Sequence, residues 1–139
     1  MKKKQTVDQD TFDPFSRSLG LVISSCEDGS SRCYLEVNEN LLNRHGTLHG
    51  GITYVVADTA MGAALYTCLY EDELCATINC QIIYVKPAKR GMITCNSRVI
   101  NRGKMLGMVE SEIIQNDVTV AKAFGTYSIF KSDQYKDKD

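Results

Sequence analysis

The segment from Gly50 to Tyr70 constrains the fold of this 139-residue chain more than any other. It has the length of a helix, and small residues recur throughout it. Apolar residues would lie on nearly all sides of such a helix, which predicts that other parts of the structure wrap around it. Asp58 is the only charged residue of the segment. This carboxylate and the small residues favour a buried helix over a membrane span.

The periodicity changes to two after this helix. The segments 77–85, 92–101, 104–115 and 118–130 alternate apolar and polar residues, which predicts antiparallel strands. In the first of them, the alternation places Ile78, Cys80, Ile82 and Tyr84 on one face. Before the helix, two further strands flank Asp28-Gly29, a dipeptide typical of hairpins.

These elements predict an α+β fold in which an antiparallel sheet curls around one long helix. We expect a single domain over residues 12–130, beginning with a short helix near Pro14 that stops by Gly20. The polar residues 1–11 and the charged residues 131–139 are expected to be flexible ends. Because the outer face and the edges of the sheet would still need cover, subunits are expected to associate.

Charge and cysteine usage exclude several classes of function. The net charge is −1, so no overall attraction to nucleic acid or to an anionic membrane is expected. No apolar stretch follows the basic start, so the sequence predicts no secretory signal. None of the six cysteines forms a C-x-x-C pair or lies near a histidine, so no metal site is expected. Cys26 and Cys33 could face each other across the hairpin, but free thiols in a reducing cytoplasm are the favoured interpretation.

One motif makes the prediction specific. The sequence N-R-H-G-T-L-H-G-G at 43–51 is followed by V-V-A-D at 55–58, and Y-V-K-P-A occupies 84–88. This pattern resembles the hotdog-fold acyl-CoA thioesterases, in the branch of the phenylacetic-acid-pathway thioesterase and thioesterase superfamily member 2. The order of the predicted elements agrees with that family over residues 12–130. The resemblance implies hydrolysis of an acyl-CoA to a carboxylic acid and free coenzyme A.

The two glycines of the motif would open the long helix. The first N–H groups of a helix have no partner within it, and the helix dipole adds partial positive charge there. A thioester carbonyl aimed at the Gly50 amide would therefore have its developing negative charge stabilised. Gly51 would permit close approach of a ligand. The alternative interpretation is a glycine-rich loop that only turns tightly into a helix.

Asp58 is the second candidate for a role in catalysis. A lone buried carboxylate is costly unless it has partners, and the neighbouring residues are apolar. The resemblance implies that Asp58 acts on the thioester as a general base toward water or as a nucleophile. Asp58 follows Gly50 by eight residues, roughly 12 Å along a helix axis. Cooperating groups must each lie about 3 Å from the reacting atoms. Gly50 of one subunit is therefore expected to face Asp58 of another.

The remaining site residues rest mainly on the resemblance. Asn43 would hold water or the substrate carbonyl, or would be an ordinary turn residue, and His49 would orient the loop. Thr77 matches a hydroxyl that assists water in some relatives, or is an ordinary strand threonine. Cations at Lys86, Arg102 and Lys104, with Gly103 between the last two, could bind the phosphates of coenzyme A. Tyr54, Met61 and Leu65 could line the acyl pocket, and Thr59 could assist Asp58.

No cofactor is expected, because coenzyme A is part of the substrate. The resemblance implies a homodimer as the minimum unit, with two equivalent sites at a two-fold interface, and a homotetramer as the usual assembly. Two alternatives remain open from the sequence. One is a non-catalytic module that binds acyl-CoA or an acyl lipid, and the other is a hotdog hydratase acting on an enoyl-CoA.

Overall fold

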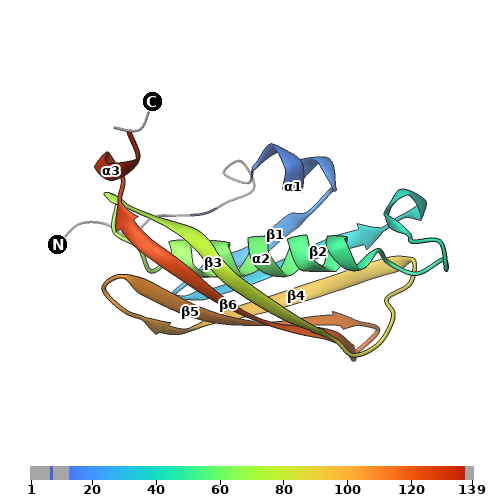
Figure 1. Ribbon diagram of the computed structural model, residues 1–139. Coiled ribbons are helices and arrows are strands. Elements are labelled where there is room, and N and C mark those ends of the chain that lie inside the picture. The colour runs from blue at the N-terminus through green and yellow to red at the C-terminus, as the bar shows by residue number, and fades with distance from the viewer. Residues whose placement is uncertain (1–6, 8–12, 137–139) are drawn as a thin grey trace.

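A six-stranded antiparallel sheet wraps around one long helix in the computed structural model, which describes residue 7 and residues 13–136 (Figure 1). The elements are α1 (Pro14–Ser18), β1 (Val22–Glu27), β2 (Ser30–Val37), the short 3-10 helix η2 (Glu39–Leu41), α2 (Gly50–Tyr66), β3 (Glu73–Tyr84), β4 (Gly91–Arg102), β5 (Leu106–Gln115), β6 (Val118–Lys131) and α3 (Asp133–Lys136). The strand order is β1-β2-β4-β5-β6-β3, and every neighbouring pair is antiparallel. The predicted α+β architecture is confirmed.

Two tight turns set the register of this sheet. Asp28 and Gly29 join β1 to β2 with φ values of 46° and 79°. Asn116 and Asp117 join β5 to β6 with φ values of 50° and 61°. Positive φ at both central residues matches the right-handed twist of the flanking strands, and Asn, Asp and Gly adopt this conformation most readily. The predicted hairpin at Asp28-Gly29 is confirmed.

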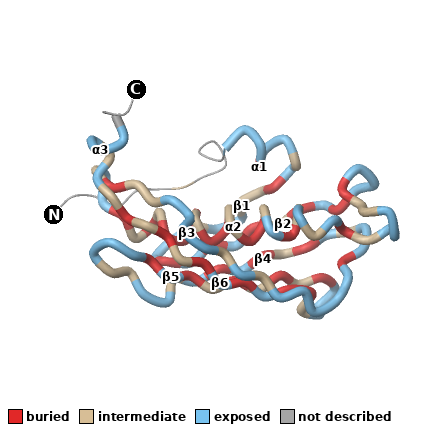
Figure 2. Tube along the Cα trace, viewed as in Figure 1, coloured by how far each residue is buried: buried red, intermediate tan, exposed pale blue. Residues whose placement is uncertain are grey.

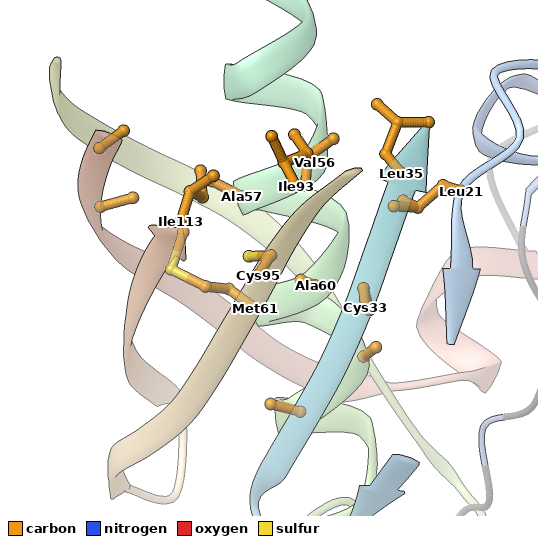
Figure 3. Packing of buried hydrophobic residues seen from close by; sticks show 14 of the residues in the cluster. Leu21, Cys33, Leu35, Val56, Ala57, Ala60, Met61, Ile93, Cys95 and Ile113 are labelled. Atoms are coloured by element: carbon orange, nitrogen blue, oxygen red, sulfur yellow. The ribbon is translucent and has the colours of Figure 1, made fainter. Parts of the chain in front are cut away.

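The core lies between α2 and the concave face of the sheet (Figures 2 and 3). Val56, Ala57, Ala60 and Met61 of α2 are fully buried there, packed among apolar residues of the strands. The small side chains let the helix approach the strands closely, so that the Ser31 hydroxyl donates a 2.6 Å hydrogen bond to the Ala60 carbonyl. This approach fixes how far each helical side chain stands from β3 and β6.

The opposite side of α2 is not covered by the sheet. Gly51 and Tyr54 are exposed, and Asp58 is only half-buried. The helix also ends at Tyr66, not near Tyr70. A six-stranded sheet can cover only one side of a helix, so one chain leaves the other side accessible.

The adjacent strand β3 is an edge of the sheet and carries exposed apolar residues. Ile78, Ile83 and Tyr84 are 59%, 68% and 52% exposed. The prediction that Ile78 shares one face with Cys80, Ile82 and Tyr84 is wrong, because the β3–β6 register shifts between Thr77 and Asn79. Such a shift interrupts the alternation of faces. The ladder is regular from Asn79 to Tyr84, so Cys80, Ile82 and Tyr84 alternate onto one face as predicted.

The two ends of the chain differ in how far the structure describes them. Of the predicted flexible residues 1–11, only Val7 is described, half-buried against the core, and the others lie outside the described residues. The predicted flexible segment 131–139 starts too early. Lys131 still belongs to β6, α3 follows it, and the rings of Phe130 and Tyr135 stack with centroids 6.4 Å apart. Residues 137–139 lie outside the described part.

The six cysteines are free thiols. Cys26 lies opposite Ser31 in the β1–β2 ladder and Cys33 lies opposite Ile23, so the two cysteines do not face each other across the hairpin. None of the helices that the structure describes is long and apolar enough to cross a lipid bilayer.

Candidate active site

Asp58 lies at the middle of the accessible side of α2, where two strands bring hydroxyl groups to its carboxylate. The Thr77 hydroxyl on β3 donates to Oδ1 at 2.8 Å, and the Tyr127 hydroxyl on β6 lies 2.9 Å from the same oxygen. Thr77 and Tyr127 are direct partners in the β3–β6 ladder, which explains why both reach one atom. The second oxygen, Oδ2, accepts no hydrogen bond from any described residue. Oδ1 is thus held in place, and Oδ2 remains available to accept a hydrogen bond.

The groups around this carboxylate are neutral near pH 7. Burial, and then the Asp58 charge, raise the pKa of the Cys75 thiol to about 12. Burial also raises the pKa of Cys80, and burial followed by the Asp58 charge raises that of Tyr127. A thiol acts as a nucleophile only when it is ionised, so these cysteines are inert at neutral pH. The thiols beside Asp58 therefore supply no nucleophile at this position.

The N-terminus of α2 presents the second feature of the site. His49 is the N-cap, and its Nδ1 accepts a 2.9 Å hydrogen bond from the Gly51 N–H. The Ile52 N–H donates to the His49 carbonyl, also at 2.9 Å. In contrast, the Gly50 N–H donates to none of the described residues. The capping role of His49 leaves one unpartnered donor at the positive end of the helix dipole.

The ring of Tyr84 closes one side of this position. Its hydroxyl donates a 2.7 Å hydrogen bond to the Gly50 carbonyl. A Cβ atom added to Gly50 would lie 3.3 Å from that hydroxyl oxygen and 3.4 Å from the ring. A side chain at residue 50 would therefore crowd Tyr84, and glycine leaves the amide accessible.

A cavity of about 270 Å³ adjoins Tyr84. Lys86 is the only charged residue among the described residues that line it. The lining is otherwise mainly apolar: Leu48, Thr53, Tyr84, Val85, Pro87, Ala88 and Val120. The cavity thus combines apolar walls with one cation beside the start of α2.

The side chain of Asn43 forms its hydrogen bonds within its own turn. Its Oδ1 accepts from the backbone N–H groups of His45 and Thr47 at 2.9 and 3.2 Å, and its Nδ2 donates to the Thr47 hydroxyl. An amide nitrogen carries two hydrogens, so one donor remains for a reactant. The structure accounts for Asn43 as a turn residue, the alternative that the sequence left open.

Several predicted substrate-binding residues lie away from Asp58. Met61 and Leu65 are fully buried in the core of the chain and do not line the cavity beside Tyr84. The Thr59 hydroxyl lies 3.3 Å from that of Ser16, so it contacts α1 and not the Asp58 carboxylate. Tyr54 is exposed on the same accessible side of α2 as Asp58, with its hydroxyl 3.5 Å from the Cys80 carbonyl.

Arg102 has a structural role that the sequence did not indicate. Its guanidinium forms an ion pair with the buried Glu73, donates to the Cys68 carbonyl and lies over the ring of Tyr70. A guanidinium held by these contacts is not free to bind a phosphate of coenzyme A. Lys104, beyond Gly103 in the same turn, is exposed and forms no ion pair within residues 13–136. No described cluster of His, Cys, Asp and Glu has the composition of a metal site.

Sequence reasoning missed Tyr127. The signal was present in the alternation of residues 118–130, which places this tyrosine on the inward face with Ile129 and Gly125. A buried tyrosine hydroxyl needs a hydrogen-bond partner. The partner, Asp58, lies 69 positions away in the sequence, and only the fold identifies it.

Comparison with known proteins places these features in a family. Residues 45–122 match the Thioesterase superfamily. The chain is 31% identical to the acyl-coenzyme A thioesterase PaaI of Escherichia coli, over 78% of this chain and 77% of that protein. It is 32% identical to human acyl-coenzyme A thioesterase 13, over 71% of each chain. A conserved protein of Pseudomonas aeruginosa superimposes with a TM-score of 0.84 at 31% identity, covering 88% of this chain and 98% of that one. The match spans more than half of the chain, including Gly50, Asp58 and Thr77, and the chain belongs to the Thioesterase superfamily and has its hotdog fold.

Proposed function

We propose that this protein is an acyl-CoA thioesterase that releases a carboxylic acid and free coenzyme A. The observation that carries the proposal is the state of Asp58: two hydroxyl groups hold Oδ1, and Oδ2 has no partner among the described residues. The Gly50 N–H at the start of the same helix donates to none of the described residues. The relatives named as acyl-coenzyme A thioesterases support this reaction.

The reaction needs both features at one carbonyl carbon. Asp58 acts as the general base that takes a proton from water, or attacks the carbonyl itself. The Gly50 N–H stabilises the negative charge that develops on the carbonyl oxygen. Collapse of the tetrahedral intermediate breaks the C–S bond, and the departing thiolate of coenzyme A takes up a proton. Direct attack by Asp58 would add an anhydride intermediate that water hydrolyses.

The site is shared between two subunits in this proposal. Gly50 and Asp58 lie on one continuous helix, roughly 12 Å apart along its axis at 1.5 Å per residue. Two such helices packed antiparallel would bring Gly50 of one subunit to Asp58 of the other. The accessible side of α2 and the exposed apolar edge of β3 adjoin each other at Asp58, which supports an interface there. The family resemblance implies a homotetramer of two such dimers, and the free thiols favour a cytoplasmic location.

Coenzyme A would lie at the ends of this interface. Lys104 and Lys86 are the candidates for its phosphates, since Arg102 is paired with Glu73. The apolar cavity beside Tyr84 is a candidate for part of the substrate chain.

A panel of acyl-CoAs tests the proposal. Aryl-acetyl, medium-chain and long-chain thioesters are incubated with the protein, and free thiol is measured. Release of coenzyme A from at least one of them is expected. Binding without thiol release would overturn the proposal in favour of a non-catalytic module, and addition of water to an enoyl-CoA without thiol release would favour a hydratase.

Gly50→Pro tests the amide itself. Proline is well tolerated at the first position of a helix and lacks the N–H, and His49 already has the extended backbone that precedes proline. Gly50→Ala is the matched control, because it adds a similar Cβ and keeps the N–H. We expect kcat to fall about 100-fold or more further in Gly50→Pro than in Gly50→Ala. Equal decreases of kcat in the two variants would show that the Gly50 N–H does not stabilise the transition state.

Mixing two inactive variants tests the shared site. Gly50→Pro and Asp58→Ala are dissociated, mixed in equal amounts and reassembled. Half of the random dimers contain one of each chain and one intact site, so recovery of about a quarter of the wild-type activity is expected. No recovery in mixtures shown to exchange subunits would contradict a site built from two chains.

A further inference from the structure

We propose that Tyr127 is a positioning residue that, with Thr77, fixes which oxygen of Asp58 faces the substrate. This inference rests on the proposed function and adds a residue from β6 to its site. Both hydroxyl groups donate to Oδ1, so Oδ2 is the oxygen presented to water or to the thioester carbonyl.

The position of the Tyr127 hydroxyl supports a dedicated role. It lies 2.9 Å from Oδ1 and 3.0 Å from the backbone carbonyl oxygen of the same residue, Asp58. A phenol has one proton, and a charged acceptor forms the stronger hydrogen bond, so the carboxylate is the favoured acceptor. Burial and the Asp58 charge raise the pKa of Tyr127, which keeps its hydroxyl protonated as a donor.

The packing around the ring indicates how this position is maintained. Tyr127 is 2% exposed, and its ring crosses over Gly125 on the same strand. A Cβ atom on Gly125 would lie 2.6 Å from Cε2 of the ring, and one on Gly62 of α2 would lie 3.9 Å from Cε1. The missing side chain at Gly125 is therefore what lets the ring lean toward Asp58.

Two donors on one oxygen restrict the carboxylate more than one donor would. An aspartate can rotate about two side-chain bonds, and a single hydrogen bond leaves one of these rotations available. Thr77 approaches from β3 and Tyr127 from β6, so together they restrict both rotations. Both donors belong to the same chain as Asp58, so each subunit orients its own carboxylate before a partner contributes Gly50.

The substitution Tyr127→Phe tests the proposal, because it removes the hydroxyl and keeps the ring. We expect kcat on the best acyl-CoA of the panel to fall about 10- to 100-fold, since a misplacement of about 1 Å costs that much. The KM is expected to stay within about twofold, because Tyr127 is buried and acts through Asp58. A role in stability alone would lower the melting temperature without changing kcat of the folded enzyme.

Tyr34→Phe is the matched control, because Tyr34 is a half-buried tyrosine on β2, away from Asp58 in the sheet order. It is expected to leave kcat and KM unchanged. If Tyr127→Phe unfolds below the assay temperature, Gly125→Ala replaces it, since the added Cβ displaces the ring and keeps the hydroxyl in the chain. The same loss of kcat with little change in KM is expected.

The outcomes separate this inference from the proposed function. An active wild-type protein whose kcat is unchanged by Tyr127→Phe, or by Gly125→Ala where that variant replaces it, would overturn the positioning role alone. A wild-type protein that releases coenzyme A from no acyl-CoA would overturn the proposed function and the positioning role with it.

Discussion

Replacing Asp58 by asparagine isolates the chemistry of its free oxygen. Asparagine keeps the shape of the side chain and a carbonyl oxygen that can still accept from Thr77 and Tyr127. The atom that changes is Oδ2, which becomes an NH₂ group and can neither accept a proton from water nor attack a carbonyl. Because positioned bases contribute about 10²- to 10⁴-fold, we expect kcat to fall by roughly three orders of magnitude.

The structure also limits what this substitution does to stability. Two hydrogen bonds to a charged acceptor become bonds to a neutral one, a loss of about 1 kcal/mol each, or about 2 kcal/mol together. Removing a half-buried charge offsets part of this loss. At about 3 °C for each kcal/mol, the melting temperature should fall by no more than about 6 °C. The variant should therefore be folded when it is assayed.

The assay measures thiol release from the best acyl-CoA together with thermal unfolding. Asp28→Asn is the matched control, because it makes the same chemical change in the β1–β2 turn, where asparagine tolerates the positive φ. Its activity should stay within about twofold of wild type. If Asp58→Asn kept more than about a tenth of the wild-type kcat, Asp58 would be neither base nor nucleophile, and the reasoning from its two donors would fail.

Three further predictions concern the ion pair, the lysine and the thiols. Arg102→Met removes the nearer of the two cations that pair with the buried carboxylate of Glu73 and leaves Lys131, whose Nζ lies 3.7 Å from Oε1, as the other. The free energy of unfolding measured in urea should therefore fall by about 2 kcal/mol, the value of a lost hydrogen bond between charged groups, while KM stays unchanged. A raised KM in a stable variant would restore Arg102 as a phosphate ligand. Lys104→Gln should raise KM for acyl-CoA several-fold without changing kcat, and this increase should diminish as salt is added. An unchanged KM in Lys104→Gln would rule out a contact between Lys104 and the phosphates of coenzyme A. Burial raises the pKa of five thiols above the value of 9.0 expected in the unfolded chain: to about 11 for Cys26 and Cys95, to about 12 for Cys33 and Cys75, and upward for Cys80 as well. The protonated thiols therefore contribute fully to stability below about pH 9, and this contribution is lost as the pH rises through about 11 to 12. The melting temperature should be constant from pH 7 to 8.5 and fall above pH 9. A constant melting temperature up to pH 11 would contradict this prediction.

Local sequence was sufficient for most of the fold. Asp28-Gly29 predicts its own turn, because the conformation depends only on these two residues and the strands beside them. The change of period after the long helix likewise predicts strands from spacing alone. The prediction failed at Ile78, where a shift of register between β3 and β6 interrupts the alternation. Such a shift depends on the partner strand, which the local pattern does not contain.

The residues of the candidate site likewise fall into those that the sequence indicates and those that only the fold identifies. The His-Gly-Gly motif and the lone carboxylate of Asp58 stand out in the sequence, because glycines at a helix start and a charge among apolar residues each have a physical cost that needs a reason. The partners of these residues do not stand out. Arg102 is one of several cations in turns, and only the folded chain pairs it with Glu73.

The amino-acid sequence by itself determined the elements, their order and the helix that carries Gly50 and Asp58, since these follow from interactions between residues a few positions apart. Only the tertiary structure decided that Tyr127 and Thr77 meet at Oδ1, because this contact depends on how β6 pairs with β3 and how closely α2 approaches both. Side chains that are distant in the sequence come together through the sheet register and the packing of the core, and no pattern within a single segment records either.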